Sequence, residues 1–510
     1  MSNIKDELTP ATLLVTISVV ILFAILRYKL RVSSKNSPPL PPGPRSLPIV
    51  GYLPFLKADL PKQFTNMARI YGPIFKFYIG NKLHVVISAP ELVKEVSRDM
   101  DDIFSNRFLT ISSSVVSFGG QDIAFSHNWR KLRKIFVQEF LSIKNLEACT
   151  CFRKDEVRKT VKNVFGKLGT TVDVRKIAIL TEANILRRMV WEDSTDLGAE
   201  LEKVTSKITE LLGRPNLSDF FPLLAWLDLQ GLERALKIEN SKLDRIYVRM
   251  IEDRIKYNSI MLDDGFGDEK KKDLLQTLLK LKDKDDATSL NITQIKAILS
   301  NVIFAGTTTT VTLIEWAMAE IIKNCNVMKR IQEELADVVG VNNIVEESHL
   351  PKLQYLDATI KETFRLHPVS PFLLPRVPSQ ECKVGGYTIP KGSIVFLNVY
   401  SLHRDPRYWD NALEFNPERF LINEGTNKCD YIGNNFKFIP FGSGRRVCPG
   451  IPLADKIQMY MLASLLHSFD WNLPEGEEHD LTEKFGITLK KSKPLLAIPS
   501  QRLHDVRLYA

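Results

Sequence analysis

One short loop with a single cysteine constrains this chain more than any other feature. Residues 441–450 read Phe-Gly-Ser-Gly-Arg-Arg-Val-Cys-Pro-Gly, and a helical stretch is expected from Leu453 onwards. Cationic neighbours and the N-terminus of a helix both favour the thiolate form of a cysteine. Glycines let the backbone approach a flat ligand closely. The loop therefore makes Cys448 a candidate ligand or nucleophile.

The residues around Cys448 leave several roles open. Most lone cysteines are small buried side chains without chemistry. A zinc site is disfavoured because no second cysteine or histidine lies at ligand spacing. A hydrolytic nucleophile would need a histidine base, which a sequence alone cannot place. A single thiolate that ligates a haem iron would account for all of the features.

The loop has the form F-x-x-G-x-R-x-C-x-G, with Phe441, Gly444, Arg446, Cys448 and Gly450 at the fixed positions. This pattern resembles the haem loop of the cytochrome P450 family. The resemblance implies a mainly α-helical cytochrome P450 fold with small β-sheets. It also implies haem b as the cofactor, with Cys448 as the axial iron ligand and with Phe441, Arg446 and Gly450 in contact with the haem.

Further motifs of the same family occur in the family's order. Glu362 and Arg365 match E-x-x-R, and Arg419 lies in a P-E-R-F segment at 417–420. The i,i+3 spacing places Glu362 and Arg365 on one face of a helix. The resemblance implies that Arg419 joins them in an ion-pair triad that holds the fold and does no chemistry.

Two more segments complete the resemblance, which covers essentially the entire chain. Trp129 and Arg133 match W-x-x-x-R and share one face of a predicted helix. The resemblance implies that both residues, together with Arg376, hold the haem propionates.

A run of four threonines follows Ala305-Gly306, where the family has A/G-G-x-D/E-T on the helix that faces bound oxygen. By resemblance, Ala305 and Gly306 lie against the haem, and the Thr309 hydroxyl donates towards oxygen. Thr308 stands where the family usually has an acid. A hydroxyl can pass a proton but carries no standing charge, so proton delivery should differ here. The alternative is a helix with a tolerated polar patch.

The chain needs an outside source of electrons. It contains neither a G-x-G-x-x-G fingerprint after a strand nor a phosphate-binding loop. By resemblance, electrons come from NADPH through a separate flavoprotein reductase. Four basic residues are candidates for a patch that docks this reductase, or are ordinary solvated charges: Arg130, Lys131, Lys134 and Arg445. The net charge of +9 is spread over 510 residues, which disfavours nucleic acid as a partner.

The N-terminus predicts a single membrane anchor. Residues 8–26 carry no charge and, as a helix, would span about 28 Å. Cations at Arg27, Lys29 and Arg31 follow, so the rest of the chain should face the cytosol. A cleaved signal peptide is disfavoured because no small-residue cleavage site follows. We predict an endoplasmic reticulum anchor at 1–30, a basic and proline-rich hinge at 31–44, and a catalytic domain at 45–510.

Local signals predict some elements of the body. Strands at Ile74–Ile79 and 83–88 flank the turn signal Gly80-Asn81, and 384–398 forms a second small β region. Most of the remainder has helical spacing. Ser126 is expected to cap the helix that begins near Trp129, and Asn291 with Thr293 to cap the next long one.

Finer resemblance is to plant microsomal enzymes, through residues 41–44, 216–222 and 227–231. Residues 129–142 and 386–392 also resemble the branch that oxidises sesquiterpenes and flavonoids. Hydroxylation of a lipophilic, sesquiterpene-like terpenoid is the leading prediction. The alternatives are a flavonoid hydroxylase, or desaturation, ring formation or rearrangement; a non-catalytic haem protein is the least favoured. The pocket candidates are Val116, Asn301, Val302, Phe304, Phe372, Leu373 and Ile487.

Overall fold

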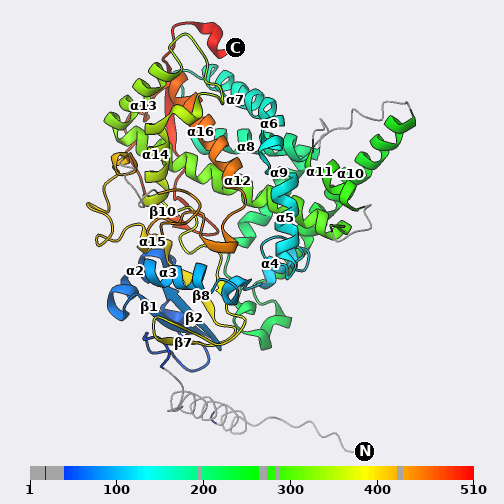
Figure 1. Cartoon of the computed structure of the whole chain (residues 1–510), viewed down its shortest axis with the longest axis vertical. Coiled ribbons are helices and arrows are strands. Elements are labelled where there is room, and N and C mark those ends of the chain that lie inside the picture. Colours follow the sequence, from blue (N-terminus) through cyan, green and yellow to red (C-terminus); the bar gives the residue numbers. More distant parts are fainter. Residues whose placement is uncertain (1–17, 19–38, 192–196, 264–272, 283–287, 422–428) are drawn as a thin grey trace, which may run out of the picture.

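The computed structural model describes residues 18, 39–191, 197–263, 273–282, 288–421 and 429–510. The predicted anchor, apart from Ser18, and residues 31–38 of the predicted hinge lie outside these residues. The described chain forms an elongated body, with the largest sheet at its lower end and long helices above it (Figure 1).

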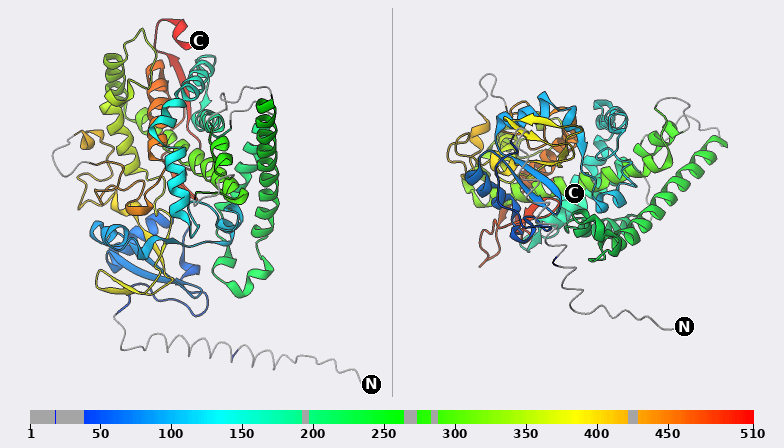
Figure 2. Two further views of the ribbon diagram at one scale, coloured as in Figure 1. Left: turned by 45° about the vertical axis from the view of Figure 1, so that its right-hand side comes forward. Right: turned by 90° about the horizontal axis from the view of Figure 1, so that it is seen from below.

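Most of the body is helical, and most of its helices bury one face in a shared core. The helices are α2 (Leu60–Tyr71), α3 (Pro90–Lys94), α4 (Ile111–Val116), α5 (Trp129–Glu139), α6 (Ile143–Ala148), α7 (Thr150–Phe165), α8 (Val174–Val190), α9 (Leu197–Leu212), α10 (Leu232–Asp263), α11 (Leu274–Lys282), α12 (Ile292–Lys323), α13 (Cys325–Val338), α14 (Gln354–Leu366), α15 (Val399–Leu402) and α16 (Ile451–Ser468). Figure 2 shows α10 as a long helix along one side of the molecule.

The strands form small sheets. They are β1 (Ile74–Ile79), β2 (Lys82–Ile87), β3 (Asn106–Arg107), β4 (Val172–Asp173), β5 (Arg376–Val377), β6 (Cys382–Val384), β7 (Tyr387–Ile389), β8 (Ile394–Leu397), β9 (Phe469–Asn472), β10 (Glu483–Phe485), β11 (Leu489–Lys491) and β12 (Leu496–Gln501). The mainly helical fold class is therefore as predicted.

The largest sheet joins distant parts of the chain. Its strand order is β1-β2-β8-β5-β3. The predicted hairpin is present: β1 pairs with β2 in antiparallel fashion, and Gly80 at the turn has a φ of 55°. β8 runs parallel to β2, with Val85 opposite Val395. The second predicted β region is thus not separate, because its last strand belongs to the first sheet.

Helix α12 runs through the centre of the helical part. Asn291 Oδ1 accepts a hydrogen bond from the Gln294 N–H (2.8 Å), and Gln294 Oε1 accepts one from the Asn291 N–H (3.1 Å). The predicted cap is therefore present, with Gln294 rather than Thr293 as its second member. Among the described residues, α12 is the helix long and apolar enough to span a membrane. Its packing against α8, α14 and α16 explains that composition.

The predicted cap of α5 is wrong. The residue before the helix is Asn128, and its side chain makes no capping hydrogen bond. Ser126 Oγ instead accepts from the Asn128 N–H at 3.0 Å, inside the preceding loop. Ser126 lies two positions too early for a cap, because the helix begins directly at Trp129 and its cap position is Asn128.

Candidate functional site

The cysteine loop is held in one shape by its glycines and by close backbone contacts. The Cys448 N–H donates to the Phe441 oxygen at 3.0 Å, which closes the loop. Gly444 has a φ of 73°, and a Cβ there would lie 1.8 Å from the Ser97 oxygen. Only glycine fits this position. The short helix η9 (Gly444–Arg446) follows, and α16 begins three residues beyond Cys448, at Ile451.

The surroundings of the Cys448 thiol act in opposite directions. Burial raises its pKa, whereas hydrogen bonds from the backbone of Gly450 and Ile451 and the charge of Arg133 lower it. The favourable cation is thus Arg133 on α5, four residues after Trp129, and not the arginines next to the cysteine in sequence. A positively charged ligand at the sulfur would add to the effect of Arg133 and stabilise the thiolate.

Four arginines, which we call the arginine cluster, gather beside this loop: Arg107, Arg133, Arg376 and Arg446. Burial lowers the pKa of Arg376 to about 10 and that of Arg446 to about 9, and Arg376 and Arg133 lower that of Arg446 further. Burial, Arg376 and Arg446 lower the pKa of Arg107 as well. The Arg446 guanidinium also lies over the Trp129 ring, 4.0 Å from its centroid.

The protein itself only partly neutralises this cluster. Asp101 acts on Arg376, and Asp122 acts on Arg446. Arg376 Nη2 donates to the Ser443 oxygen (3.1 Å), but its buried Nη1 has no hydrogen-bond partner among the described residues. Buried cations require anionic partners. A haem carries two carboxylates and an iron that accepts one thiolate, so this set of residues fits a thiolate-ligated haem.

Helix α12 continues without a break through the threonine run at 307–310. Ala305 and Thr309 are exposed, although almost all of the helix from Thr310 to Ile322 is buried. Thr309 Oγ1 donates to the Ala305 oxygen at 2.6 Å, and Thr312 Oγ1 donates to the Thr308 oxygen at 2.7 Å. These hydroxyls thus bond back to their own helix. Thr308 is half-buried.

Gly306 allows α12 to approach α8 closely. A Cβ at Gly306 would lie 2.7 Å from Leu186 Cδ1. A larger residue would therefore push the two helices apart at the level of the threonine run.

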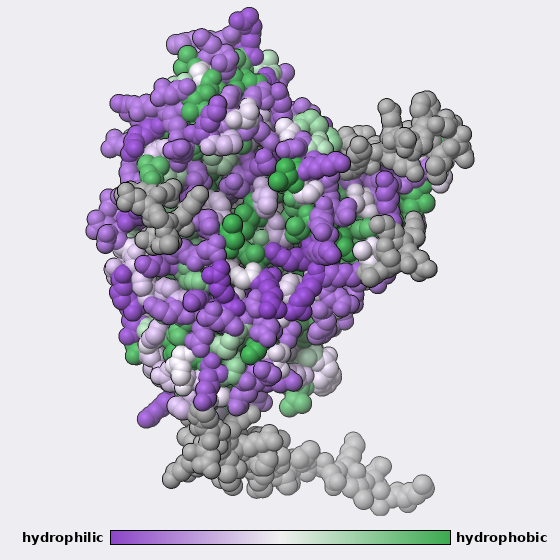
Figure 3. All heavy atoms as spheres, viewed as in Figure 1, coloured by the Kyte–Doolittle hydropathy of each residue, from purple (hydrophilic) through white to green (hydrophobic). Residues whose placement is uncertain are grey.

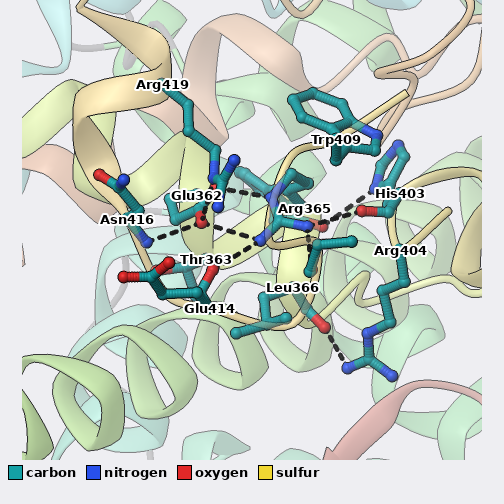
Figure 4. Close-up of polar contacts among 12 residues, drawn as sticks. Glu362, Thr363, Arg365, Leu366, His403, Arg404, Trp409, Glu414, Asn416 and Arg419 are labelled. Carbon is teal, nitrogen blue, oxygen red and sulfur yellow. Dashed lines mark hydrogen bonds and ion pairs between the residues drawn. The ribbon is translucent and has the colours of Figure 1, made fainter. Parts of the chain in front are cut away.

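Glu362, Arg365 and Arg419 meet in a buried network (Figure 4). Arg365 binds both Glu362 oxygens, at 2.7 and 2.8 Å, and Arg419 Nε lies 3.3 Å from Glu362 Oε1. The remaining Arg365 hydrogens go to the backbone oxygens of His403, Ala412 and Glu414. The network joins α14 to η7 (Pro417–Phe420) and to the segment between α15 and η7.

The seven pocket candidates differ in their burial and in their contacts. Asn301 uses its amide to hold the loop before α5: its oxygen accepts from the Ile123 N–H, and its nitrogen donates to Asp122. Phe372 is buried among aromatic rings, and its ring centroid lies 5.1 Å from that of Phe64. Val116 and Val302 are buried, Phe304 and Leu373 half-buried, and Ile487 exposed.

The candidate docking residues fall into two groups. Arg130 and Lys134 are exposed on α5. Lys131 Nζ donates to the Ser289 oxygen at 2.6 Å, and Arg445 pairs with Asp101 at 3.0 Å. Lys131 and Arg445 therefore have partners within the protein, and Arg130 lies over the Trp129 ring, 4.8 Å from its centroid.

Sequence reasoning missed Arg107 and the acids that face the cluster. Arg107 stands opposite Arg376 in the pairing of β3 with β5. No local motif marks a strand of two residues. Asp101 and Asp122 lie in loops, and only the arginines of the predicted propionate site could have suggested a search for them.

Comparison with known proteins agrees with this geometry. The sequence model of the family described as "Cytochrome P450" matches residues 41–498. A flavonoid 3'-monooxygenase of Crocosmia x crocosmiiflora is 37% identical over 506 residues, covering 96% of this chain and 97% of that protein. A carnosic acid synthase of Salvia pomifera is 35% identical over 486 residues, covering 92% of this chain and 95% of that protein.

A solved structure is similar as well. A zebra fish cytochrome P450 with abiraterone has a TM-score of 0.74 and 25% identity, and the alignment covers 88% of this chain and 100% of that one. The family match and the full-length likeness to plant enzymes show that this chain belongs to the cytochrome P450 family and is a cytochrome P450 monooxygenase.

Proposed function

We propose that this protein is a haem-thiolate monooxygenase that hydroxylates a lipophilic plant specialised metabolite, with a sesquiterpene-like terpenoid as the leading substrate class. NADPH supplies the electrons through a separate reductase. One observation carries the proposal: a loop shaped by its glycines holds the Cys448 thiol beside the buried Arg376 and the half-buried Arg446, whose charges the protein only partly neutralises.

The roles of the residues follow from this arrangement. Cys448 provides the thiolate, and the N–H groups of Gly450 and Ile451 hold its charge. Arg133, Arg376 and Arg446, with Trp129 stacked on Arg446, hold the cofactor's carboxylates. When bound, the haem activates O2 so that one oxygen atom enters a C–H bond and the other leaves as water.

On α12, Ala305 and Gly306 carry no bulky side chain, and Thr309 places a hydroxyl at an exposed position of the helix. That hydroxyl can exchange its bond to the Ala305 oxygen for one to a ligand or to water. It can then pass a proton to a molecule held at this point of the helix. Thr308 can pass a proton but supplies no charge.

The substrate class rests on apolar residues and on the relatives. Val302, Phe304 and Val116 offer apolar surface on α12 and α4. The carnosic acid synthases support a terpenoid. The flavonoid 3'-monooxygenases support the second candidate, a flavonoid.

An apolar surface patch supports attachment to a membrane. Leu223 and Trp226 of η5 (Pro222–Leu227) are 89% and 81% exposed, and Leu47 and Ile49 are exposed too. The Gly80 turn joins the two groups: its N–H donates to the Val50 oxygen, and a Cβ at Gly80 would lie 2.5 Å from the Phe220 oxygen. Apolar surface is visible at this lower end in Figure 3, where the described chain also begins (Figures 1 and 2). A patch of this kind marks a membrane or a partner.

The substrate proposal is tested in microsomes that contain the protein, reductase and NADPH. A panel of sesquiterpenes and flavonoids is supplied under isotopically labelled O2, and products are identified by mass. A labelled hydroxyl on a sesquiterpene is the expected result. If only flavonoids become labelled, the substrate class is a flavonoid and not a terpenoid. If the products are dehydrogenated or rearranged and carry no label, the reaction is not hydroxylation.

Attachment is tested by deleting residues 2–30. The truncated protein should remain haem-loaded and become partly soluble, because the proposed pocket lies outside the deleted segment. Exchange of Trp226 and Leu223 for serine in the truncated protein should increase the soluble fraction further. Loss of haem at unchanged protein abundance would contradict a separate anchor.

A further inference from the structure

A buried carboxyl group on α8 is not used by any contact described so far. Glu182 is 1% exposed, and its Oε2 has no hydrogen-bond partner among the described residues. Burial alone raises the pKa of Glu182 to about 8. A buried carboxyl without a partner is costly and is kept protonated by its surroundings. Glu182 is therefore a neutral acid that holds a transferable proton near neutral pH.

Two contacts place Glu182 relative to the threonine run. Leu186 of α8 meets Gly306 of α12, and Arg175 Nε pairs with Glu315 Oε2 at 2.7 Å. Later residues of α8 thus face earlier residues of α12, so the two helices run antiparallel. Glu182 lies one turn before Leu186, and Thr310 lies one turn after Gly306. Both are buried, and the helical repeat sets them at the same level.

Helix α12 has no proton source of its own at this level. Between Lys296 and Glu315 it carries no ionisable side chain. Its hydroxyls at 307–310 can relay a proton but cannot store one near neutral pH. A proton for this part of the helix must come from solvent or from a neighbouring element.

The charged groups on the helices around Glu182 are either paired with other residues or exposed. On α12, Glu315 pairs with Arg175. On α7, Glu156 pairs with Lys159 and Arg188. On α11, the lysines at 280 and 282 are exposed. None of these groups contributes to the pKa of Glu182.

We infer that Glu182 is the acid that supplies protons to the threonine run of α12. The Glu182 O–H donates its proton to the Thr310 hydroxyl oxygen, directly or through water, while the Thr310 proton moves on along the run. The carboxylate left behind then takes a proton from solvent. Glu182 is a positioning and supply residue, because it acts through the threonines. This inference rests on the proposed function.

The first test needs no turnover. Infrared spectra of the haem-loaded protein are compared with those of Glu182→Gln between about pH 6 and about pH 9. The wild type should show a carboxylic acid carbonyl band that fades as the pH rises through the pKa, and the variant should lack it. A carboxylate band already present at the acid end would overturn the inference.

The second test measures coupling, the ratio of organic product to NADPH consumed. Glu182→Gln should lower it about tenfold or more, since a positioned proton donor contributes on the order of 10²–10⁴ in rate. Glu182→Asp should retain part of it. Adding Thr308→Asp to Glu182→Gln should restore coupling, because an acid on α12 replaces the one lost from α8. A purely structural Glu182 would not be rescued.

The matched control is Glu156→Gln, which removes a buried carboxylate from α7 and should leave coupling unchanged. If the wild type forms product and Glu182→Gln is equally coupled, the inference fails while the proposed function stands. If the wild type forms no oxygenated product from any substrate, the proposed function fails first.

Discussion

The cysteine loop and the threonine run differ in where their polar groups find hydrogen-bond partners. Around Cys448 and Arg365, most polar atoms are tied to named partners, often backbone oxygens of remote segments, and Arg376 Nη1 is the exception described above. Around Thr309, hydroxyls bond within their own helix, and Glu182 on the neighbouring helix α8 is buried with an unpartnered oxygen. The first region is rigid and made for one cofactor. In the second, the threonine hydroxyls can exchange their bonds to helix carbonyls for bonds to other partners, which suits a site that moves protons.

The largest effect is expected from Cys448→Ala, which tests whether the cysteine loop holds the cofactor through its thiolate. A methyl group cannot provide the electron donation of a thiolate. We expect complete loss of the thiolate-type shift in the carbon monoxide difference spectrum of the reduced protein. The control is Cys429→Ala, a free cysteine elsewhere, which should leave the shift intact. A full shift in Cys448→Ala would end the haem-thiolate proposal.

Glu362→Gln tests the rigidity of the cysteine side. The variant leaves Arg365 and Arg419 buried without their carboxylate, which should cost about 3–5 kcal/mol of unfolding free energy. Asp357→Asn is the matched control on the same helix, because it breaks the partly exposed Asp357–Lys361 pair and should cost about 0.3–0.5 kcal/mol. Urea unfolding measures both. Equal losses would show that the network is no stronger than a surface pair.

Arg376→Met separates stability from cofactor binding. Without haem, the variant should be more stable by about 1–3 kcal/mol, because a buried unpartnered donor is removed. With haem, it should lose the cofactor faster to an acceptor protein. Arg507→Met, at an exposed arginine, should change neither property.

The same substitution predicts a pH dependence. Burial lowers the pKa of Arg376 to about 10 in the folded chain, below its value in the unfolded one. The charged arginine therefore destabilises the folded state at neutral pH, and this cost is relieved as the pH rises through about 10. The stability difference between the cofactor-free wild type and the variant should narrow over that range. A constant difference would contradict a charged Arg376 as its cause.

Thr308→Asp should have the smallest effect. It places an acid on α12 and should raise coupling several-fold and lower hydrogen peroxide release, less than a sole proton donor would achieve. Thr309→Ala should do the opposite. Unchanged coupling in Thr308→Asp would show that the missing acid is no handicap. Loss of product would show that the shape of the site matters more than its charge.

The two regions also differ in how far their contacts could be predicted from the sequence. Glu362 and Arg365 lie one helical turn apart, so their meeting could be predicted from spacing. The cysteine loop is equally local, because its glycines and Cys448 form one motif. Arg107 and Glu182 could not be found this way, since each gains its neighbours from pairing between segments remote in the chain. Ser126 failed as a cap because a shift of two residues at a helix start leaves no trace in composition.

The pairing of β2 with β8 has a consequence for biosynthesis. More than half of the chain separates the two strands, so the sheet at the lower end closes only once residue 397 has left the ribosome. Contacts of such high contact order form slowly. Until then the edge of β2 stays open to wrong partners. The nascent chain should therefore depend on chaperones for most of its synthesis, long after its first hairpin has emerged.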